Sequence, residues 1–153
     1  MSCRPLYRAV FLLLTCILPW LVSGCPEKKS TPAVVKFKVA GTDCTSDNIV
    51  IKNVSAKVWV TSGQTILGWS AALFCKVDDK EEPLKGATLT ITVNGFTIGN
   101  NTATTGTDGG VSGTSSSGAT EDDLNGKPFE LQIQGDDKQP HPVAGGSGTI
   151  QKT

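Results

Sequence analysis

The chain has 153 residues, with 14 Lys and Arg balanced by 14 Asp and Glu, and it contains one His and one Tyr. This length indicates a single domain. Zero net charge argues against a nucleic-acid-binding protein, which usually has a basic face. The scarcity of His and Tyr leaves most acid–base and metal chemistry without its usual residues. We therefore predict a non-catalytic protein with no cofactor and no metal site.

Residues 1–24 have the organisation of a secretory signal. Arg4 and Arg8 precede a nearly uninterrupted apolar stretch at residues 9–22. A helix of this length rises about 21 Å, which is short of the roughly 30 Å hydrocarbon core of a bilayer. The stretch therefore suits the apolar region of a signal peptide better than a permanent membrane span.

The end of this signal, Leu21-Val22-Ser23-Gly24-Cys25, resembles the lipobox of bacterial lipoproteins, which is an aliphatic residue, two small residues and a cysteine. The resemblance implies cleavage before Cys25, transfer of a diacylglycerol to its thiol and acylation of the new amino end. Several acyl chains suffice for stable membrane anchoring. The alternative is an ordinary signal peptide that happens to be followed by a cysteine.

The residues after Cys25 are expected to form a tether. In enteric bacteria an Asp after the lipidated cysteine retains a lipoprotein in the inner membrane. This chain has Pro26 at that position, which favours the outer membrane, and the sequence does not indicate which leaflet. Residues 26–32 are charged and bounded by prolines, which is typical of a short linker. We predict a lipidated cysteine and tether at residues 25–32 and a folded domain at residues 33–153 in the bacterial cell envelope.

The remaining cysteines predict one disulfide. Cys3 and Cys16 leave with the signal, so Cys44 and Cys75 are an even pair in an oxidising compartment. Their bridge would close a loop of about 30 residues, and the chain-entropy model gives it roughly 3–4 kcal/mol. A redox or metal-binding pair is the weaker alternative, because the sequence has no C-x-x-C motif and no His near either cysteine.

Apolar residues in the mature chain recur with a period of two, which is typical of half-buried strands. Asn94-Gly95, Asp108-Gly109 and Asn125-Gly126 supply the positive φ angles that tight hairpin turns require. No window of a dozen residues has a helical stripe. These signals predict an all-β fold, a single antiparallel sandwich of about six to eight strands. The alternating stretches are residues 35–39, 49–51, 58–60, 73–77, 87–93 and 129–133.

Residues 99–118 are dominated by Gly, Ser and Thr, and Ala103 and Val111 are the only apolar residues among them. The first half is compatible with a polar hairpin around Asp108-Gly109. The second half, residues 113–118 (GTSSSG), has the composition of a mobile loop.

Residues 72–95 (ALFCKVDDKEEPLKGATLTITVNG) resemble the central segment of bacterial Ig-like domains of the invasin and intimin type. Val77 and Asp79 match the V-x-D of that family, and Pro83 with Gly86-Ala87 matches its P-x-x-G-A. Residues 104–111 (TTGTDGGV) are similar to the T-T-D-x-x-G-V hairpin of the family, with one extra glycine. Carboxypeptidase-regulatory-like and transthyretin-like domains share these motifs. The resemblance implies an Ig-like sandwich that acts as a spacer or an adhesive module, and a solitary copy has no stalk to extend.

Trp59 and Trp69 are the candidate ligand-binding residues, because an exposed tryptophan can stack on a sugar ring or anchor a protein partner. Val58 and Val60 flank Trp59, so Trp59 points outward if those valines are in the core. We expect one of the two tryptophans in the core, where sandwiches often pack a tryptophan against an inter-sheet disulfide.

The acidic clusters at residues 78–82, 121–123 and 136–137 are predicted to be solvated turns. A calcium site needs six to eight oxygens in a defined array, which none of these spacings matches. Paired carboxylates for glycoside hydrolysis would need a cleft, and nothing in the sequence indicates one. His141 lies between two prolines without an accompanying nucleophile motif, so it predicts no catalysis.

Two functional hypotheses follow from these observations. The first is an envelope lipoprotein that is attached to the membrane through the lipid on Cys25 and binds an envelope or surface protein, as an adhesion or assembly module. Such a partner can add a strand to a free sheet edge. The second is a carbohydrate-binding module that binds a glycan through Trp59 or Trp69. An enzyme is a distant third, and no nucleic-acid partner is expected.

Overall fold

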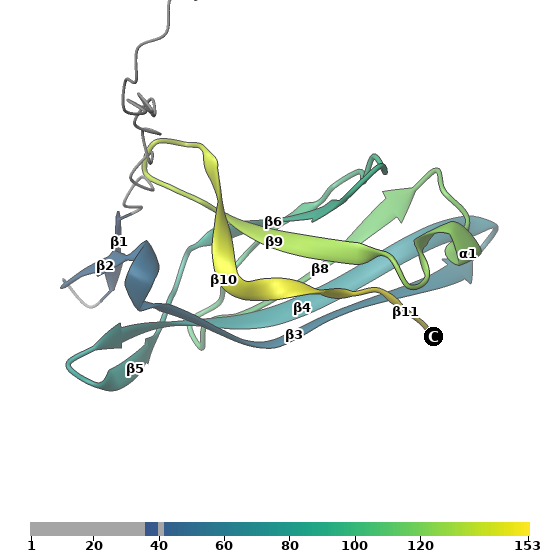
Figure 1. Ribbon diagram of the computed structural model, residues 1–153. Helices are drawn as coiled ribbons and strands as arrows, with labels where there is room; N and C mark the ends of the chain where they lie inside the picture. Colours follow the sequence, from purple (N-terminus) through teal and green to yellow (C-terminus); the bar gives the residue numbers. More distant parts are fainter. Residues whose placement is uncertain (1–35, 40–41) are drawn as a thin grey trace, which may run out of the picture. The chain divides into compact units, whose positions relative to one another are not determined.

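The computed structural model describes residues 36–39 and 42–153, which belong to one compact unit, Pro32–Thr153. The predicted signal peptide, the predicted lipidation site at Cys25 and the predicted tether lie outside the described residues. Within them the chain forms eleven strands, a 3-10 turn η1 and a four-residue helix α1 (Figure 1). In chain order these elements are β1 Lys36–Val39, β2 Thr42–Thr45, η1 Ser46–Asn48, β3 Ile49–Thr61, β4 Gln64–Val77, β5 Lys80–Pro83, β6 Thr88–Val93, β7 Thr102–Thr104, β8 Gly110–Ser117, α1 Glu121–Leu124, β9 Pro128–Gln134, β10 Pro140–Thr149 and β11 Gln151–Lys152.

The strands form a β-sandwich, which confirms the predicted all-β class. One sheet has four strands in the order β10-β9-β6-β7. The other has five strands in the order β11-β3-β4, with β8 and β5 following one another along the free edge of β4. β1 and β2 form a separate two-stranded sheet. The pairings are antiparallel except for the short β11, which runs parallel to β3.

The hairpin of β3 and β4 is the longest feature of the five-stranded sheet. Its register contains eleven residue pairs, from Ile49 with Cys75 to Thr61 with Gln64. The connecting residues Ser62 and Gly63 have φ angles of 49° and 74°, as a two-residue type I′ turn requires. A bulge interrupts the register between Lys52 and Ser55. The alternation of inward and outward side chains therefore shifts by one position at the bulge, and β3 joins two stretches of sequence whose alternation differs.

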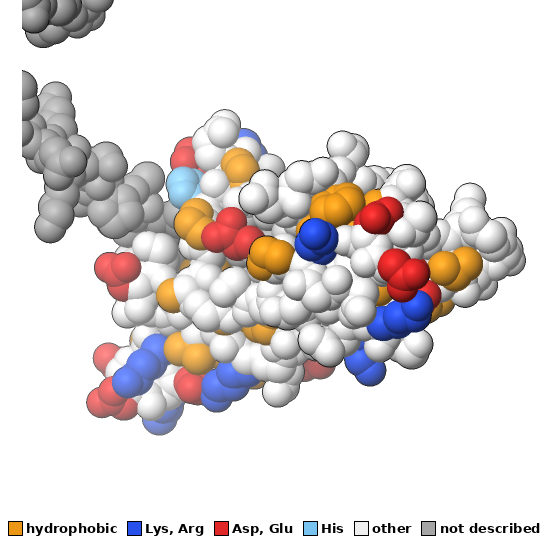
Figure 2. Space-filling view, turned by 45° about the vertical axis from the view of Figure 1, so that its right-hand side comes forward, with side chains coloured by type: hydrophobic (Ala, Val, Ile, Leu, Met, Phe, Trp, Pro, Cys, Tyr) orange, Lys and Arg blue, Asp and Glu red, His pale blue; other side chains and the backbone are white. Residues whose placement is uncertain are grey.

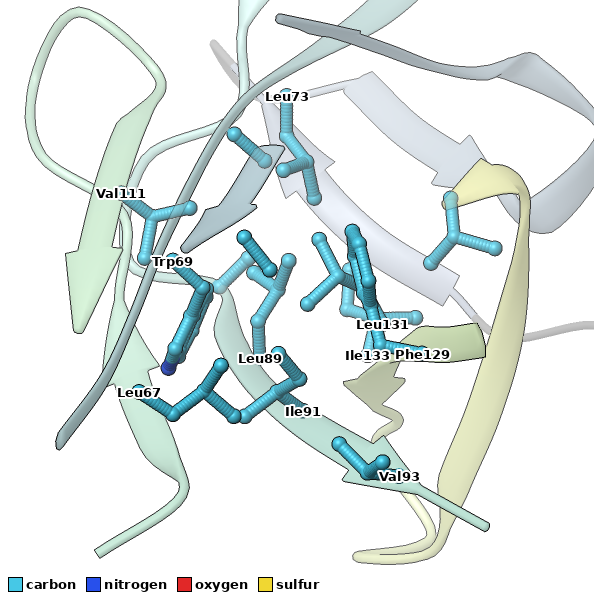
Figure 3. Close-up of a cluster of buried hydrophobic side chains, with 14 of the residues drawn as sticks. Leu67, Trp69, Leu73, Leu89, Ile91, Val93, Val111, Phe129, Leu131 and Ile133 are labelled. Carbon is cyan, nitrogen blue, oxygen red and sulfur yellow. The ribbon is translucent and has the colours of Figure 1, made fainter. Parts of the chain in front are cut away.

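The core lies between the two sheets and follows the predicted alternation. Leu67 and Trp69 of β4 face Leu89 and Ile91 of β6 in Figure 3, and all four side chains are at most 3% exposed. Leu131 of β9 is fully buried beside them. The outward residues between these positions are half-buried or exposed. A period of two is therefore sufficient to place the core of the central strands.

Three aromatic side chains lie over glycines of neighbouring strands. A Cβ atom added at Gly113 would lie 2.6 Å from Cε2 of Trp69, and one added at Gly148 would lie 2.9 Å from the ring of Phe129. A Cβ atom at Gly68 would lie 2.5 Å from two ring atoms of Trp59. Each glycine provides the space that an indole or phenyl ring occupies, so these glycines serve packing rather than chain flexibility.

The prediction of a mobile loop at residues 113–118 is wrong, because Gly110–Ser117 forms strand β8 and pairs with residues 65–72 of β4. The long strand β4 offers a continuous hydrogen-bonding edge, and this tertiary pairing overrides the weak local preference for a strand. Val111 and Ser115 point inward and are buried. The small residues of β8 fit the space beside the large Trp69 indole.

The predicted disulfide between Cys44 and Cys75 is confirmed, with a Cα–Cα distance of 6.0 Å. It joins β2 to β4, and both cysteines are fully buried. The prediction that a tryptophan packs against this bridge is wrong. Trp69 lies six residues from Cys75 on the same strand, which corresponds to about 20 Å at 3.3 Å per residue.

Two predicted hairpin turns have other roles. Asp108-Gly109 connects β7 to β8, which belong to different sheets. Asn125 ends helix α1, and Gly126 with a φ angle of 77° leads from it to β9. The helix itself begins with a capping box in which Thr120 and Asp123 satisfy each other's backbone N–H groups. These dipeptides therefore predict correctly where the chain changes direction, but they do not predict which elements the turns connect.

Candidate functional site

The β3–β4 hairpin defines two ends of the sandwich. Its open end lies beside β2 and the disulfide, where the chain enters the fold, and we call it the entry end. The turn at Ser62-Gly63 marks the opposite, distal end, together with α1 and the turn at Asn94-Gly95 (Figure 1). β3 has thirteen residues and spans roughly 40 Å, so the two ends are well separated.

A cleft of about 1040 Å³ lies at the distal end. Its apolar surface comes from Val60 of β3, Phe96 after β6 and Ala119 before α1. Hydroxyl groups and glycine backbone surround these apolar side chains, and two carboxylates lie at one side. The remaining lining residues are Gly63, Gln64, Thr65, Gly95, Thr97, Gly99, Ser116, Ser117, Gly118, Thr120, Glu121 and Asp122.

Val60 is the most informative residue of the cleft. Ala56 and Val58 point into the core at 2% and 0% exposure, and the alternation of β3 directs Val60 to the same side. Val60 is nevertheless 53% exposed, so only Val58 of the two valines that flank Trp59 belongs to the core. Among residues 43–153, for which the structure describes side-chain exposure, it is the one large hydrophobic side chain that is mostly exposed. An inward-facing hydrophobic residue is thus left accessible at the distal end.

A lysine of β11 forms ion pairs with both carboxylates of the cleft. Nζ of Lys152 lies 2.9 Å from a carboxylate oxygen of Glu121 and 2.9 Å from one of Asp122. Hydrogen bonds to these two carboxylates raise the pKa of Lys152. The neighbouring Asp123 accepts hydrogen bonds from the hydroxyl and the backbone N–H of Thr120, which lower its pKa. Residues 121–123 therefore serve local structure, but they form the capped helix α1 beside a cleft and not the solvated turn that was predicted.

The other two acidic clusters lie at hairpin turns far from the cleft. Asp78 and Asp79, with φ angles of 49° and 61°, form the turn between β4 and β5. Asp137 accepts a hydrogen bond from the backbone N–H of Gln139, and it also contacts His141 Nε2 at 2.9 Å; both interactions lower its pKa. In Figure 2, charged side chains gather at the β4–β5 hairpin and beside α1, while much of the remaining face is uncharged.

The two tryptophans have different environments. Trp69 is 3% exposed, which confirms the expectation that one tryptophan belongs to the core, and its indole N–H has no hydrogen-bond partner. Trp59 lies on the outer face of the five-stranded sheet and is half-buried. Trp69 is therefore structural, and Trp59 remains a candidate for ligand contact.

Thr105 joins the two segments that resemble Ig-like domains, residues 72–95 and 104–111. This residue was not identified from the sequence. The hydroxyl of Thr105 donates to the carbonyl of Leu84 and accepts from the N–H of Ala87 at 2.9 Å. Its backbone N–H donates to the carbonyl of Ala87 at 2.9 Å, and its carbonyl accepts from Gly86 at 3.1 Å. Thr105 thereby fastens the P-x-x-G-A segment to the end of β7.

Residues 36–39 and 42–153 include no group of three or more His, Cys, Asp or Glu side chains placed to hold a metal ion. No helix of this part of the chain is long and apolar enough to cross a membrane. Comparison of the chain with protein-family models, with curated proteins and with solved structures gives no match. The functional interpretation therefore rests on the geometry of the cleft and of the sheet surfaces.

Proposed function

We propose that this protein is a lipid-anchored, non-catalytic binding module of the bacterial envelope, and that its distal cleft binds a protein partner. The exposure of Val60, inward-facing yet 53% accessible, is the observation that carries this proposal. An exposed apolar surface enclosed by polar residues is the usual composition of a protein interface, in which an apolar centre is surrounded by a polar rim.

The composition of the cleft favours a protein over a small charged ligand. Phe96 and Val60 offer apolar contacts, while Thr65, Thr97 and Ser117 offer hydroxyl groups around them. Lys152 neutralises one of the two carboxylate charges, so the cleft has little net charge for an ion to recognise. Segments from three different turns contribute to the lining, and variation in such turns changes specificity without disturbing the sheets.

The position of the lipobox supports the same function. Cys25 lies eleven residues before Lys36, so a lipid on Cys25 is joined through a short tether to the entry end of the sandwich. Eleven residues reach at most about 40 Å when extended. The cleft lies at the opposite end of the β3–β4 hairpin, where a partner is least obstructed by the membrane.

Anchoring is tested with Cys25→Ala in the producing bacterium. We expect this variant to accumulate unprocessed or to leave the detergent phase on phase partitioning, whereas the parent protein stays in that phase. Cys44 and Cys75 provide an internal control, because their bridge forms in both proteins if both are exported. Normal detergent-phase partitioning of Cys25→Ala would contradict lipid anchoring.

Binding at the cleft is tested by photo-crosslinking in cells. A photoreactive residue replaces Val60, and a matched protein carries it instead at the exposed Glu82 of the β4–β5 hairpin, at the entry end. We expect one discrete protein adduct from position 60, none of the same mass from position 82, and loss of the adduct when Thr97→Glu adds a charge to the cleft wall. Equal adducts from both positions, or no adduct from position 60, would refute the cleft as the partner site.

A further inference from the structure

We infer that the outer face of the five-stranded sheet around Trp59 binds a saccharide chain that carries carboxylate groups. This surface lies on the side of β3 opposite to Val60, so it is separate from the distal cleft. The inference goes beyond the proposed protein partner and requires neither the cleft nor the lipid.

The placement of Trp59 is the first step. Trp59 pairs with Ile66 across the β3–β4 hairpin, and its indole extends diagonally until the outer edge of the six-membered ring lies over Gly68. A Cβ atom at Gly68 would lie 2.5 Å from Cζ3 and Cη2 of this ring, so the arrangement depends on glycine. The indole is thereby held against the sheet while part of it stays exposed.

Trp59 also differs from the other aromatic residues of the fold. Trp69 and Phe129 lie over their glycines inside the core, at 3% exposure each. Phe74, on the same outer face as Trp59, has Nζ of Lys52 5.4 Å from its ring centroid, so a cation already occupies one face of its ring. Among the described residues no such cation lies over Trp59. A large aromatic surface is therefore available at this position without contributing to the core.

Hydroxyl groups surround the indole. Gly68 pairs with Thr114 of β8, and the next outward residue of β4, Ser70, pairs with Ser112. On the other side Ser70 pairs with Ser55, and their hydroxyl oxygens are 3.0 Å apart. Neighbouring strands are about 4.8 Å apart and two residues along a strand span about 7 Å, so these hydroxyls lie within about two sugar rings of Gly68. They offer both donors and acceptors to a ligand that lies across the sheet.

The charge of this surface indicates an acidic ligand. Lys57 pairs with Gly68 in the register, and it forms no ion pair within the described part of the chain. The strand segments around Lys57 contain no Asp or Glu; these are residues 55–61 of β3, 66–72 of β4 and 110–116 of β8. A lysine that forms no ion pair with the Asp and Glu side chains of the described residues favours an anionic group on the ligand.

These three features match the chemistry of an acidic saccharide. The C–H groups on one face of a sugar ring are apolar and pack on an indole, while the hydroxyls at the ring edge exchange hydrogen bonds with Ser and Thr. A carboxylate on the sugar then meets the ammonium group of Lys57. The interaction needs no catalytic group and no metal.

The test uses the full lipoprotein in detergent and two hexamers of similar length, oligogalacturonate and the neutral cellohexaose, with binding measured by calorimetry. We expect the acidic hexamer to bind more tightly. Trp59→Ala should weaken its binding at least about tenfold, because both apolar burial and ring contact are lost. Trp59→Phe should retain most of the binding.

Further variants assign the contributions. Lys57→Gln should weaken binding of the acidic hexamer about two- to fivefold, and high salt should have the same effect on the parent protein, since an exposed ion pair is weak and screened. Gly68→Ala should displace the indole and weaken binding like Trp59→Ala. Thr97→Glu, in the distal cleft, is the matched control and should leave saccharide binding unchanged.

Three results would overturn the inference: no binding of oligogalacturonate, equal binding by the parent protein and Trp59→Ala, or equal affinity for the acidic and the neutral hexamer. Circular dichroism spectra of the variants verify that each remains folded. The crosslinked adduct from position 60 does not depend on these results, so failure of the saccharide site and failure of the protein site are distinguishable.

Discussion

Replacement of Thr105 by valine should destabilise the sandwich strongly, although the two side chains have nearly the same shape. Thr105 is 4% exposed, and its hydroxyl is bonded to the carbonyl of Leu84 and the N–H of Ala87. Leu84 and Ala87 are themselves 1% and 2% exposed, so water cannot replace the lost hydroxyl without local opening. Thr105→Val therefore leaves one buried donor and one buried acceptor unpaired.

The magnitude follows from these two groups. Each unpaired buried group costs about 1–3 kcal/mol, so the free energy of unfolding should fall by about 2–6 kcal/mol for the two groups together. Thr105→Ser keeps the hydroxyl and loses one methyl group, which costs about 1 kcal/mol. The structure thus predicts that the valine variant, which conserves volume, is less stable than the serine variant, which does not. Thermal midpoints should differ by roughly 4 °C per kcal/mol for a domain of this size.

Urea unfolding followed by tryptophan fluorescence measures both variants, since the buried Trp69 reports on the core. The disulfide stays intact throughout, so the unfolded state is the same for the two proteins. A valine variant as stable as the serine variant would show that the Thr105 hydrogen bonds contribute little, and it would refute the reasoning.

Three further predictions concern other features of the fold. Cys75→Ser should lower the free energy of unfolding by about 3–4 kcal/mol in urea titrations, because it opens a loop with a sequence separation of 31 residues; an unchanged midpoint would contradict this role. Gly113→Ala should cost about 1–3 kcal/mol through overlap with the Trp69 ring, whereas Gly118→Ala, which meets open space, should be nearly neutral in the same assay, and equal effects would argue against the packing explanation. The hydrogen bonds from Thr120 lower the pKa of Asp123, so the stabilisation by its carboxylate is present above about pH 4 and is lost as the pH falls through the lowered pKa. Asp123→Asn should therefore reduce the fall in the free energy of unfolding between about pH 5 and pH 2. An unchanged dependence of this free energy on pH would contradict the prediction.

The central strands were predictable because their alternation is uninterrupted. Residues 87–93 and 129–133 contribute β6 and β9, and their apolar positions are the buried ones. The β3–β4 hairpin was only partly predictable. Ile49 is buried before the bulge and Ala56 and Val58 after it, so the inward positions change from odd to even numbers within one strand. A search for a constant period divides such a strand into separate pieces.

Strand β8 and the distal cleft were not predictable for a different reason. The small residues of β8 are fitted to an indole on β4, and a composition rich in Gly and Ser has the same appearance in a linker. The cleft combines Val60, Phe96 and Ala119 from segments that are distant in sequence. The alternation of β3 correctly places Val60 on the inward side. That the other described side chains leave Val60 mostly exposed at the distal end depends on how the two sheets pack, which the sequence of β3 does not indicate. Trp59, by contrast, lies on the outer face that its valine neighbours predicted.

The bridge between Cys44 and Cys75 also determines how the fold responds to a mechanical pull. With the Ser62-Gly63 turn at one end and the bridge at the other, β3 and β4 form a closed covalent ring. Tension that arrives from the amino-terminal side divides at Cys44 and enters both strands, so β3 cannot be peeled away from β4 by that force. Without the bridge, the same tension would act on β3 alone and shear its ladder of hydrogen bonds. A partner held at the turn end of this ring therefore pulls on two strands that share the force.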